Sequence, residues 1–204
     1  MKKVVSLLLT LLIAFSFASC SSGGGSGSKK EKNEVKGVIE TALEAVKKCD
    51  VKKVNKTVQS ENLKNLTAII SENKDLQKIV KSVFEPLKYD VKDVCVSEDK
   101  ASATVEFKTK DLKSVFVQYS KELISQRLQN ADSINFEDKK FVGKQVERIN
   151  ALAKEAGDKK FNVTVNLEKV DGDWVIISDD MLEDAVMGGA ASVIESMVTL
   201  FNQM

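Results

Sequence analysis

The residues with the most reactive side chains in this 204-residue chain are three cysteines, Cys20, Cys49 and Cys95, because the sequence contains no histidine. Histidine is the usual general base near neutral pH, the commonest zinc ligand and the base that activates serine or cysteine nucleophiles. Its absence leaves carboxylates and lysines as the groups available for acid–base catalysis. We therefore expect no catalytic residue, no metal ligand and no cofactor, and we expect that the protein is not an enzyme.

The segment before Cys20 has the layout of a secretion signal. Lys2-Lys3 forms a short positive region, and the apolar run Val4–Phe17 follows it. This run is shorter than the roughly 20 residues that a membrane-spanning helix needs. Ala18-Ser19 then places small residues directly before Cys20. Residues 1–19 are therefore predicted to be a cleaved signal peptide.

With Phe17-Ala18-Ser19 before the cysteine, the signal resembles that of bacterial lipoproteins, in which this cysteine becomes the lipidated first residue of the mature chain. The resemblance implies that a fatty-acyl lipid such as palmitate on Cys20 anchors the protein to the cell membrane or the outer membrane. The domain would then be extracytoplasmic, in the periplasm or at the cell surface. An ordinary secretion signal followed by a chance cysteine is the alternative.

The residues after Cys20 are suited to a tether. Ser21–Ser28 consists of serine and glycine alone, a composition typical of a flexible linker. Residues 20–33 are therefore predicted to hold the folded part of the protein away from the membrane. Residues 34–204 are long enough for one domain with a substantial core, and the only proline, Pro86, marks no hinge.

The charge balance argues against a nucleic-acid partner. Without residues 1–19, the chain keeps 29 basic and 30 acidic residues, interspersed along its length. Nucleic-acid-binding domains usually carry a marked excess of lysine and arginine on one surface.

Cys49 and Cys95 remain as a pair once Cys20 is assigned to the lipid. An extracytoplasmic protein permits a disulfide between them. Cys49 falls on the apolar face of the first predicted helix, and Cys95 lies in the first predicted strand, so the two could meet if that helix packs on the sheet. Two unpaired buried thiols are the alternative, because sequence spacing does not test the geometry of a disulfide.

The spacing of apolar residues predicts an alternation of helices and strand pairs. The predicted helices cover about residues 34–49, a short segment at 51–58, 61–72, 76–84 up to Pro86, a stretch that opens at Asp111, 137–156 up to Gly157, and a last helix from Asp179 or Asp180 to about 201 with a break at Gly188-Gly189. The predicted strand pairs are 89–96 with 101–107, which has a bulge near Asp93, and 161–167 with 173–177, joined by the favoured hairpin turn Asp171-Gly172.

Three pieces of this pattern resemble, in order, small bacterial lipoproteins with a cystatin-like domain, a group that includes the nuclear-transport-factor-two-like fold. They are the helix Val38–Val46, which ends near Cys49-Asp50, the strand pair Val91–Phe107 and the hairpin Phe161–Ile176. They cover about a third of the mature chain. The resemblance implies an α+β fold: a curved antiparallel sheet of about four strands packed on an N-terminal helix, with a helical insertion between strands two and three and a C-terminal helix. No site residue can be carried over, because the family shares no catalytic motif.

Two functions remain open from the sequence. The preferred one is a membrane-anchored lipoprotein that acts as a non-enzymatic binding or structural module of the cell envelope, with an envelope protein, a peptide or a small ligand as its partner. The alternative is a carboxylate-dependent hydrolase or isomerase with a pocket on the concave sheet face, which requires a buried carboxylate with a raised pKa. The acidic residues on otherwise apolar stretches, Asp93 and Glu106, are expected to face solvent, and Trp174 is expected to lie in the core.

Overall fold

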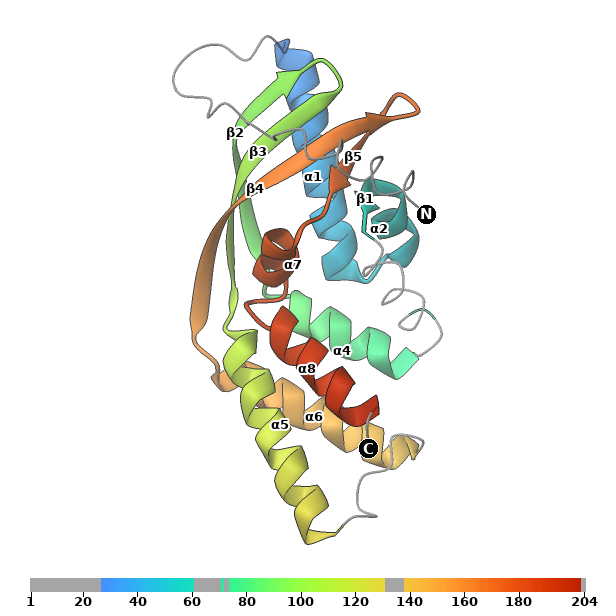
Figure 1. The fold of residues 1–204 in the computed structure, drawn as a ribbon, viewed down its shortest axis with the longest axis vertical. Helices are drawn as coiled ribbons and strands as arrows, with labels where there is room; N and C mark the ends of the chain where they lie inside the picture. Colours follow the sequence, from blue (N-terminus) through green and yellow to red (C-terminus); the bar gives the residue numbers. More distant parts are fainter. Residues whose placement is uncertain (1–26, 61–70, 72–73, 131–137, 203–204) are drawn as a thin grey trace, which may run out of the picture.

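The computed structural model describes residues 27–60, 71, 74–130 and 138–202, and every structural statement below concerns these residues. The helix predicted at residues 61–72 lies outside them except for Ser71, so it stays a prediction. Figure 1 shows an α+β fold in which a curved sheet occupies one end of the long axis and a group of helices occupies the other.

The helices begin where a side chain can accept hydrogen bonds from the first free backbone N–H groups. Ser28 and Glu31 form a capping box at the start of the first helix, and Asp50, Asp111, Asp138 and Asp179 cap four others. This capping box makes the first helix start several residues before the predicted position, so the predicted tether ends at Ser28. The helices are α1 (Lys29–Lys48), α2 (Val51–Thr57), α4 (Lys74–Phe84), α5 (Leu112–Gln129), α6 (Lys139–Glu155), α7 (Asp180–Val186) and α8 (Ala191–Asn202).

The sheet has five strands rather than the four predicted, in the order β1-β5-β4-β3-β2. The four predicted strands are present and pair in antiparallel fashion, whereas β1 adds to β5 in parallel, so the sheet is mixed. Val58, predicted to be helical, belongs to β1. A strand of two residues is too short to show the alternation that identifies strands in a sequence. The strands are β1 (Val58–Gln59), β2 (Lys88–Ser97), β3 (Lys100–Lys110), β4 (Asp158–Val170) and β5 (Asp173–Ile177).

Two backbone irregularities in the sheet confirm sequence predictions. The pairing of β2 with β3 shifts its register between Lys92 and Cys95, and Asp93 between them has a φ of 49°. Asp171 and Gly172 have φ values of 53° and 89°, as the predicted hairpin turn requires. Asp93 and Glu106 are both exposed, as expected.

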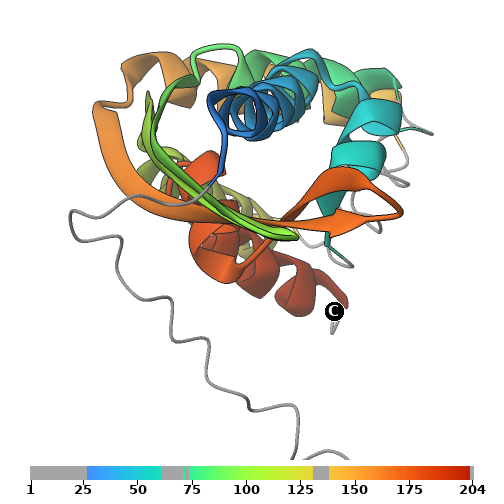
Figure 2. The same ribbon diagram turned by 90° about the horizontal axis from the view of Figure 1, so that it is seen from above.

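A first hydrophobic core, which we call the sheet core, lies between α1 and the sheet. Figure 2 shows α1 inside the curve of the sheet. Ile39 of α1 and Phe107 of β3 are among its fully buried side chains, and Trp174 is 7% exposed, which confirms its predicted place in the core. Leu182 and Ala185 of α7, which packs against β4, complete this core.

A second hydrophobic core, which we call the helical core, lies at the other end of the molecule (Figure 1). The helical insertion predicted between the second and third strands of the antiparallel sheet is present as α5 and α6. These helices bury one face against each other and against α4 and α8. The buried side chains of this core are Val83, Leu112, Val115, Tyr119, Leu123, Phe141, Ile149, Leu152 and Ala190.

Glycines mark two boundaries, for different reasons. Gly188 and Gly189 have φ values of 59° and 83° and separate α7 from α8, as predicted. Gly157 follows α6 without being its cap: the extended residue Ala156 is the cap, and the Gly157 carbonyl accepts a hydrogen bond of 2.9 Å from the Asp111 N–H. Gly157 therefore links the end of α6 to the start of α5 instead of ending its helix through a left-handed backbone.

Candidate functional site

The predicted lipidation site, Cys20, lies outside the described residues, but the structure shows where the folded domain begins. Gly27 lies so close to β2 that a Cβ added to it would be 2.5 Å from the Cβ of Val96. Ser28 caps α1 directly afterwards. Seven residues, 21–27, therefore separate Cys20 from the first helix cap, and the chain enters the domain beside the β2–β3 hairpin (Figure 1).

Cys49 and Cys95, for which the sequence allowed a disulfide, are both thiols in the structure. Cys49 caps the C-terminal end of α1, whereas Cys95 precedes Val96, which lies against Gly27 at the other end of that helix. A helix of 20 residues is about 30 Å long, and the Cα atoms of a disulfide lie within about 7 Å of each other. The helix does pack on the sheet, as that prediction required, but it runs antiparallel to β2 and so keeps the two cysteines apart.

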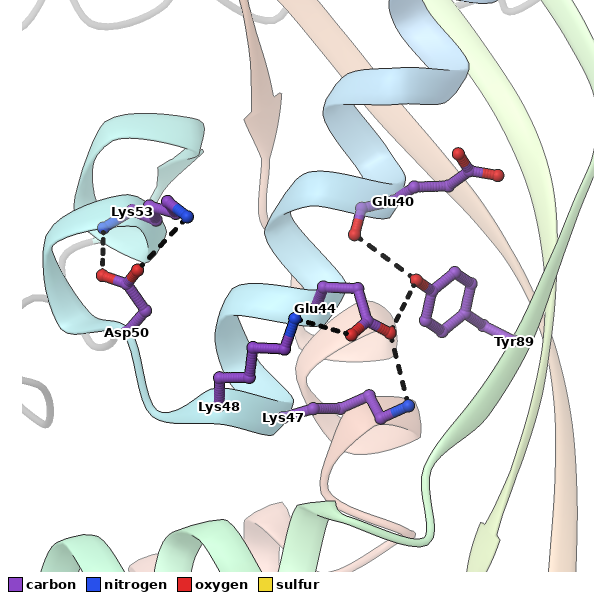
Figure 3. A network of polar contacts seen from close by, with 7 residues as sticks. All are labelled: Glu40, Glu44, Lys47, Lys48, Asp50, Lys53 and Tyr89. Atoms are coloured by element: carbon purple, nitrogen blue, oxygen red, sulfur yellow. Dashed lines mark hydrogen bonds and ion pairs between the residues drawn. The ribbon is translucent and has the colours of Figure 1, made fainter.

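A network of polar side chains joins α1 to the start of β2 (Figure 3). The Tyr89 hydroxyl donates a hydrogen bond of 3.0 Å to Oε1 of Glu44 and lies 3.4 Å from the backbone oxygen of Glu40. Glu44 also lies 3.3 Å from Nζ of Lys47 and 3.6 Å from Nζ of Lys48. One carboxylate therefore meets a phenol from the sheet and two ammonium groups from the last turn of its own helix.

The protonation states of Glu44 and Tyr89 favour a structural role for this network over a catalytic one. The hydrogen bond from Tyr89 and the neighbouring lysines lower the pKa of Glu44. Burial, and then the Glu44 carboxylate, raise the pKa of Tyr89 to about 12. Glu44 is therefore ionised and Tyr89 protonated at neutral pH, which is the pairing that the hydrogen bond needs. General acid–base catalysis needs a group that gains or loses its proton near the working pH, and neither residue does so.

A second charged contact, between Glu122 and Arg148, ties α5 to α6. Arg148 binds the carboxylate in bidentate fashion, with Nε 2.7 Å and a terminal nitrogen 2.6 Å from the two oxygens. Gln118 donates a further hydrogen bond of 3.0 Å. These donors lower the pKa of Glu122 to about 2, so the carboxylate stays ionised far below neutral pH.

Replacing Glu122 with glutamine is expected to lower the free energy of unfolding at pH 7 by about 0.5–1 kcal/mol, because the pair is partly solvated. Since the folded pKa lies below the ordinary value of 4.5, the contribution of Glu122 is present above about pH 5 and is lost as the pH falls towards 2. The difference between wild type and Glu122→Gln in urea unfolding should therefore shrink over this range. Glu147→Gln, at an exposed position of α6, is the control. A difference that stays constant down to pH 2 would contradict this assignment.

Two acidic residues near the last hairpin, Asp171 and Asp179, have structural roles. Asp171 forms the turn, and Asp179 accepts a hydrogen bond of 2.8 Å from the Leu182 N–H as the cap of α7. Among the described residues, no group of three or more cysteine or acidic side chains is arranged to hold a metal ion. In the same part of the chain, no helix combines the length and the apolar character needed to cross a membrane.

Neither the Tyr89–Glu44 contact nor the Glu122–Arg148 pair was predicted from the sequence. Tyr89 and Glu44 are 45 residues apart, and Glu122 and Arg148 are 26 residues apart, so each depends on the tertiary fold. The Glu44–Lys47 and Glu44–Lys48 pairs could have been identified, because residues three and four positions apart face each other on a helix.

Comparison with solved structures shows a distant likeness to a bacterial protein. No family model and no curated protein matches the chain. A crystal structure of a candidate lipoprotein, YcdA, from Bacillus subtilis subsp. subtilis str. 168 resembles it with a TM-score of 0.37 and 18% sequence identity. The match covers 60% of this chain and 39% of the Bacillus chain, which is less than half of that protein. The cystatin-like arrangement stays a prediction.

Proposed function

We propose that the protein is a lipoprotein anchored through Cys20 to a membrane of the cell envelope, and that its domain is a non-enzymatic binding or structural module on the extracytoplasmic side. The observation that carries this proposal is the order of features at the N-terminus: two lysines, an apolar run too short to span a membrane, and Phe17-Ala18-Ser19-Cys20. The capped start of α1 at Ser28 supports it, because it leaves a short serine- and glycine-rich connection between the anchor and the domain.

The chemistry of the described residues favours a binding or structural role over catalysis. Glu31, Glu44, Glu122 and Asp158 lie beside hydrogen-bond donors or cations that lower their pKa values. A carboxylic acid that donates a proton near neutral pH needs a raised pKa instead. The concave face of the sheet, where the alternative function placed its pocket, is occupied by apolar side chains of α1.

Lipidation can be tested by growing cells that express the full-length protein with an alkyne analogue of palmitate. The wild-type protein is expected to incorporate the label, and Cys20→Ala is expected to lose it completely, because the acyl chains are attached through this residue. Cys49→Ala is the matched control and should be labelled like the wild type. Equal labelling of Cys20→Ala and wild type, or no labelling of the wild type, would contradict the proposal.

A further inference from the structure

The near-neutral overall charge conceals a separation of charge along the chain. From Val170 to the C-terminus there are seven acidic residues and no lysine or arginine. In contrast, residues 47–56 contain five lysines and one acid, and residues 74–81 contain three lysines and one acid. The first group belongs to β5, α7 and α8, and the second to the end of α1 and to α2 and α4.

The lysines of α2 and α4 form an exposed basic surface. We call the set Lys52, Lys53, Lys56, Lys74, Lys78 and Lys81 the lysine face, and all six side chains are exposed. On α4, the spacing of four and then three residues places its members on one side of the helix. Lys53 forms an ion pair of 3.6 Å with Asp50, whereas Lys52, Lys56, Lys74 and Lys81 form none with other residues that the structure describes.

The helices that carry the lysine face and helix α8 lie on opposite sides of the sheet. Both α2 and α4 pack on α1. Figure 2 shows these three helices on one side of the sheet, while α8 projects on the other side. We call the exposed acids Asp179, Asp180 and Glu195, which belong to α7, its cap and α8, the acidic face. Glu183 of α7 does not belong to it, because its carboxylate accepts a hydrogen bond of 2.8 Å from Ser60, directly after β1.

The proposed anchor brings the helix layer that carries the lysine face close to the membrane. Seven fully extended residues span at most about 25 Å, which limits the distance between the lipid on Cys20 and the start of α1. That start belongs to the same layer as α2 and α4 (Figure 2). The domain can therefore lie with α1, α2 and α4 against the bilayer without stretching the connection.

We propose that the lysine face rests on anionic lipid headgroups and that the acidic face points away from the membrane. This inference depends on the lipid anchor proposed above. A lysine close to an anionic surface favours the bound arrangement by about fivefold, and the anchor holds the lysines within reach of the headgroups. The carboxylates of α7 and α8 are repelled by the same surface, so both faces favour one orientation.

The orientation can be measured by energy transfer in vesicles that contain the full-length, lipidated protein. Single labelling cysteines are introduced as Asn55→Cys on α2 and Met181→Cys on α7, both exposed positions, in a Cys49→Ala, Cys95→Ala background. The acceptor is a fluorophore on the lipid headgroup. In phosphatidylcholine vesicles with added phosphatidylglycerol, the label at position 55 should transfer more efficiently than the label at position 181. In pure phosphatidylcholine vesicles the difference should shrink.

Charge variants identify the cause of the orientation. Combined Lys52→Gln, Lys56→Gln, Lys74→Gln and Lys81→Gln substitutions are expected to abolish the difference between the two labels in anionic vesicles. Lys113→Gln and Lys121→Gln, at exposed positions of α5, are the control and should leave it intact. Equal transfer from positions 55 and 181 in anionic vesicles, or a difference that survives the four substitutions, would overturn the inference while the anchor still stands. Failure of the wild-type protein to float with the vesicles would overturn the anchor, and this inference with it.

Discussion

Replacing Gly188 with alanine is expected to lower the free energy of unfolding by about 2–5 kcal/mol. Gly188 lies between α7 and α8 with a φ of 59°, and an alanine in this backbone conformation costs about 1–2 kcal/mol. A Cβ at this position would also collide with the backbone oxygen of Lys110 and press on the Leu112 side chain. Relief of that collision requires a shift where β3 passes into α5, and overpacking of this kind costs about 1–3 kcal/mol more.

Urea unfolding followed by circular dichroism measures this effect, and Gly143→Ala is the matched control. Gly143 lies in the interior of α6, and a Cβ added to it would meet nothing within 4 Å. Because alanine is a better helix former than glycine, Gly143→Ala should stabilise the protein by about 0.5–1 kcal/mol. A Gly188→Ala variant as stable as the wild type would show that the α7–α8 connection does not have the described backbone.

Replacing Leu123 with alanine is expected to lower the free energy of unfolding by about 2–5 kcal/mol, the usual cost of removing a large apolar side chain from a core. Leu123 is 2% exposed in the helical core. Trp174, the only tryptophan, lies in the sheet core. If residues 34–204 form one cooperative domain, as the sequence predicts, the unfolding midpoints from tryptophan fluorescence and from far-ultraviolet circular dichroism should fall together.

Leu128→Ala is the control for this experiment, because Leu128 lies on the same helix and is 85% exposed. It should leave both midpoints close to those of the wild type. A fluorescence midpoint that stays unchanged in Leu123→Ala, while the circular dichroism midpoint falls, would mean that the two cores unfold independently. The chain would then contain two domains rather than one.

The helices and strands with a regular spacing of apolar residues, and the turn with favourable residues, were predicted from the sequence. Features that form only through tertiary contacts were not. The alternation in β3 and β4 and the Asp171-Gly172 turn gave the central hairpins, because these signals are local. β1 has two residues and exists because β5 pairs with it. The helical core was not anticipated either, since it depends on the docking of α4 and α8 onto α5 and α6.

The candidate site also has features that the sequence could predict and features that depend on the fold. The signal before Cys20 is contiguous in the sequence and needs no fold to be recognised. Because α1 runs antiparallel to β2, Cys95 of β2 lies near the start of α1, whereas Cys49 lies at the end of α1. The spacing of apolar residues carries no information about this direction. The sequence shows that acids gather after Val170 and lysines at residues 47–56 and 74–81, but only the fold shows that α2 and α4 lie on one side of the sheet and α8 on the other.

The most direct test of the lipid anchor is the mass of the N-terminal peptide of the mature protein, purified from the membranes of cells that express the full chain. Proteolysis followed by mass spectrometry gives both the first residue and any modification that it carries. We expect a peptide that begins at Cys20 and is heavier by a fatty-acyl lipid. An unmodified Cys20, or a mature chain that begins at another residue, would rule out the lipid anchor.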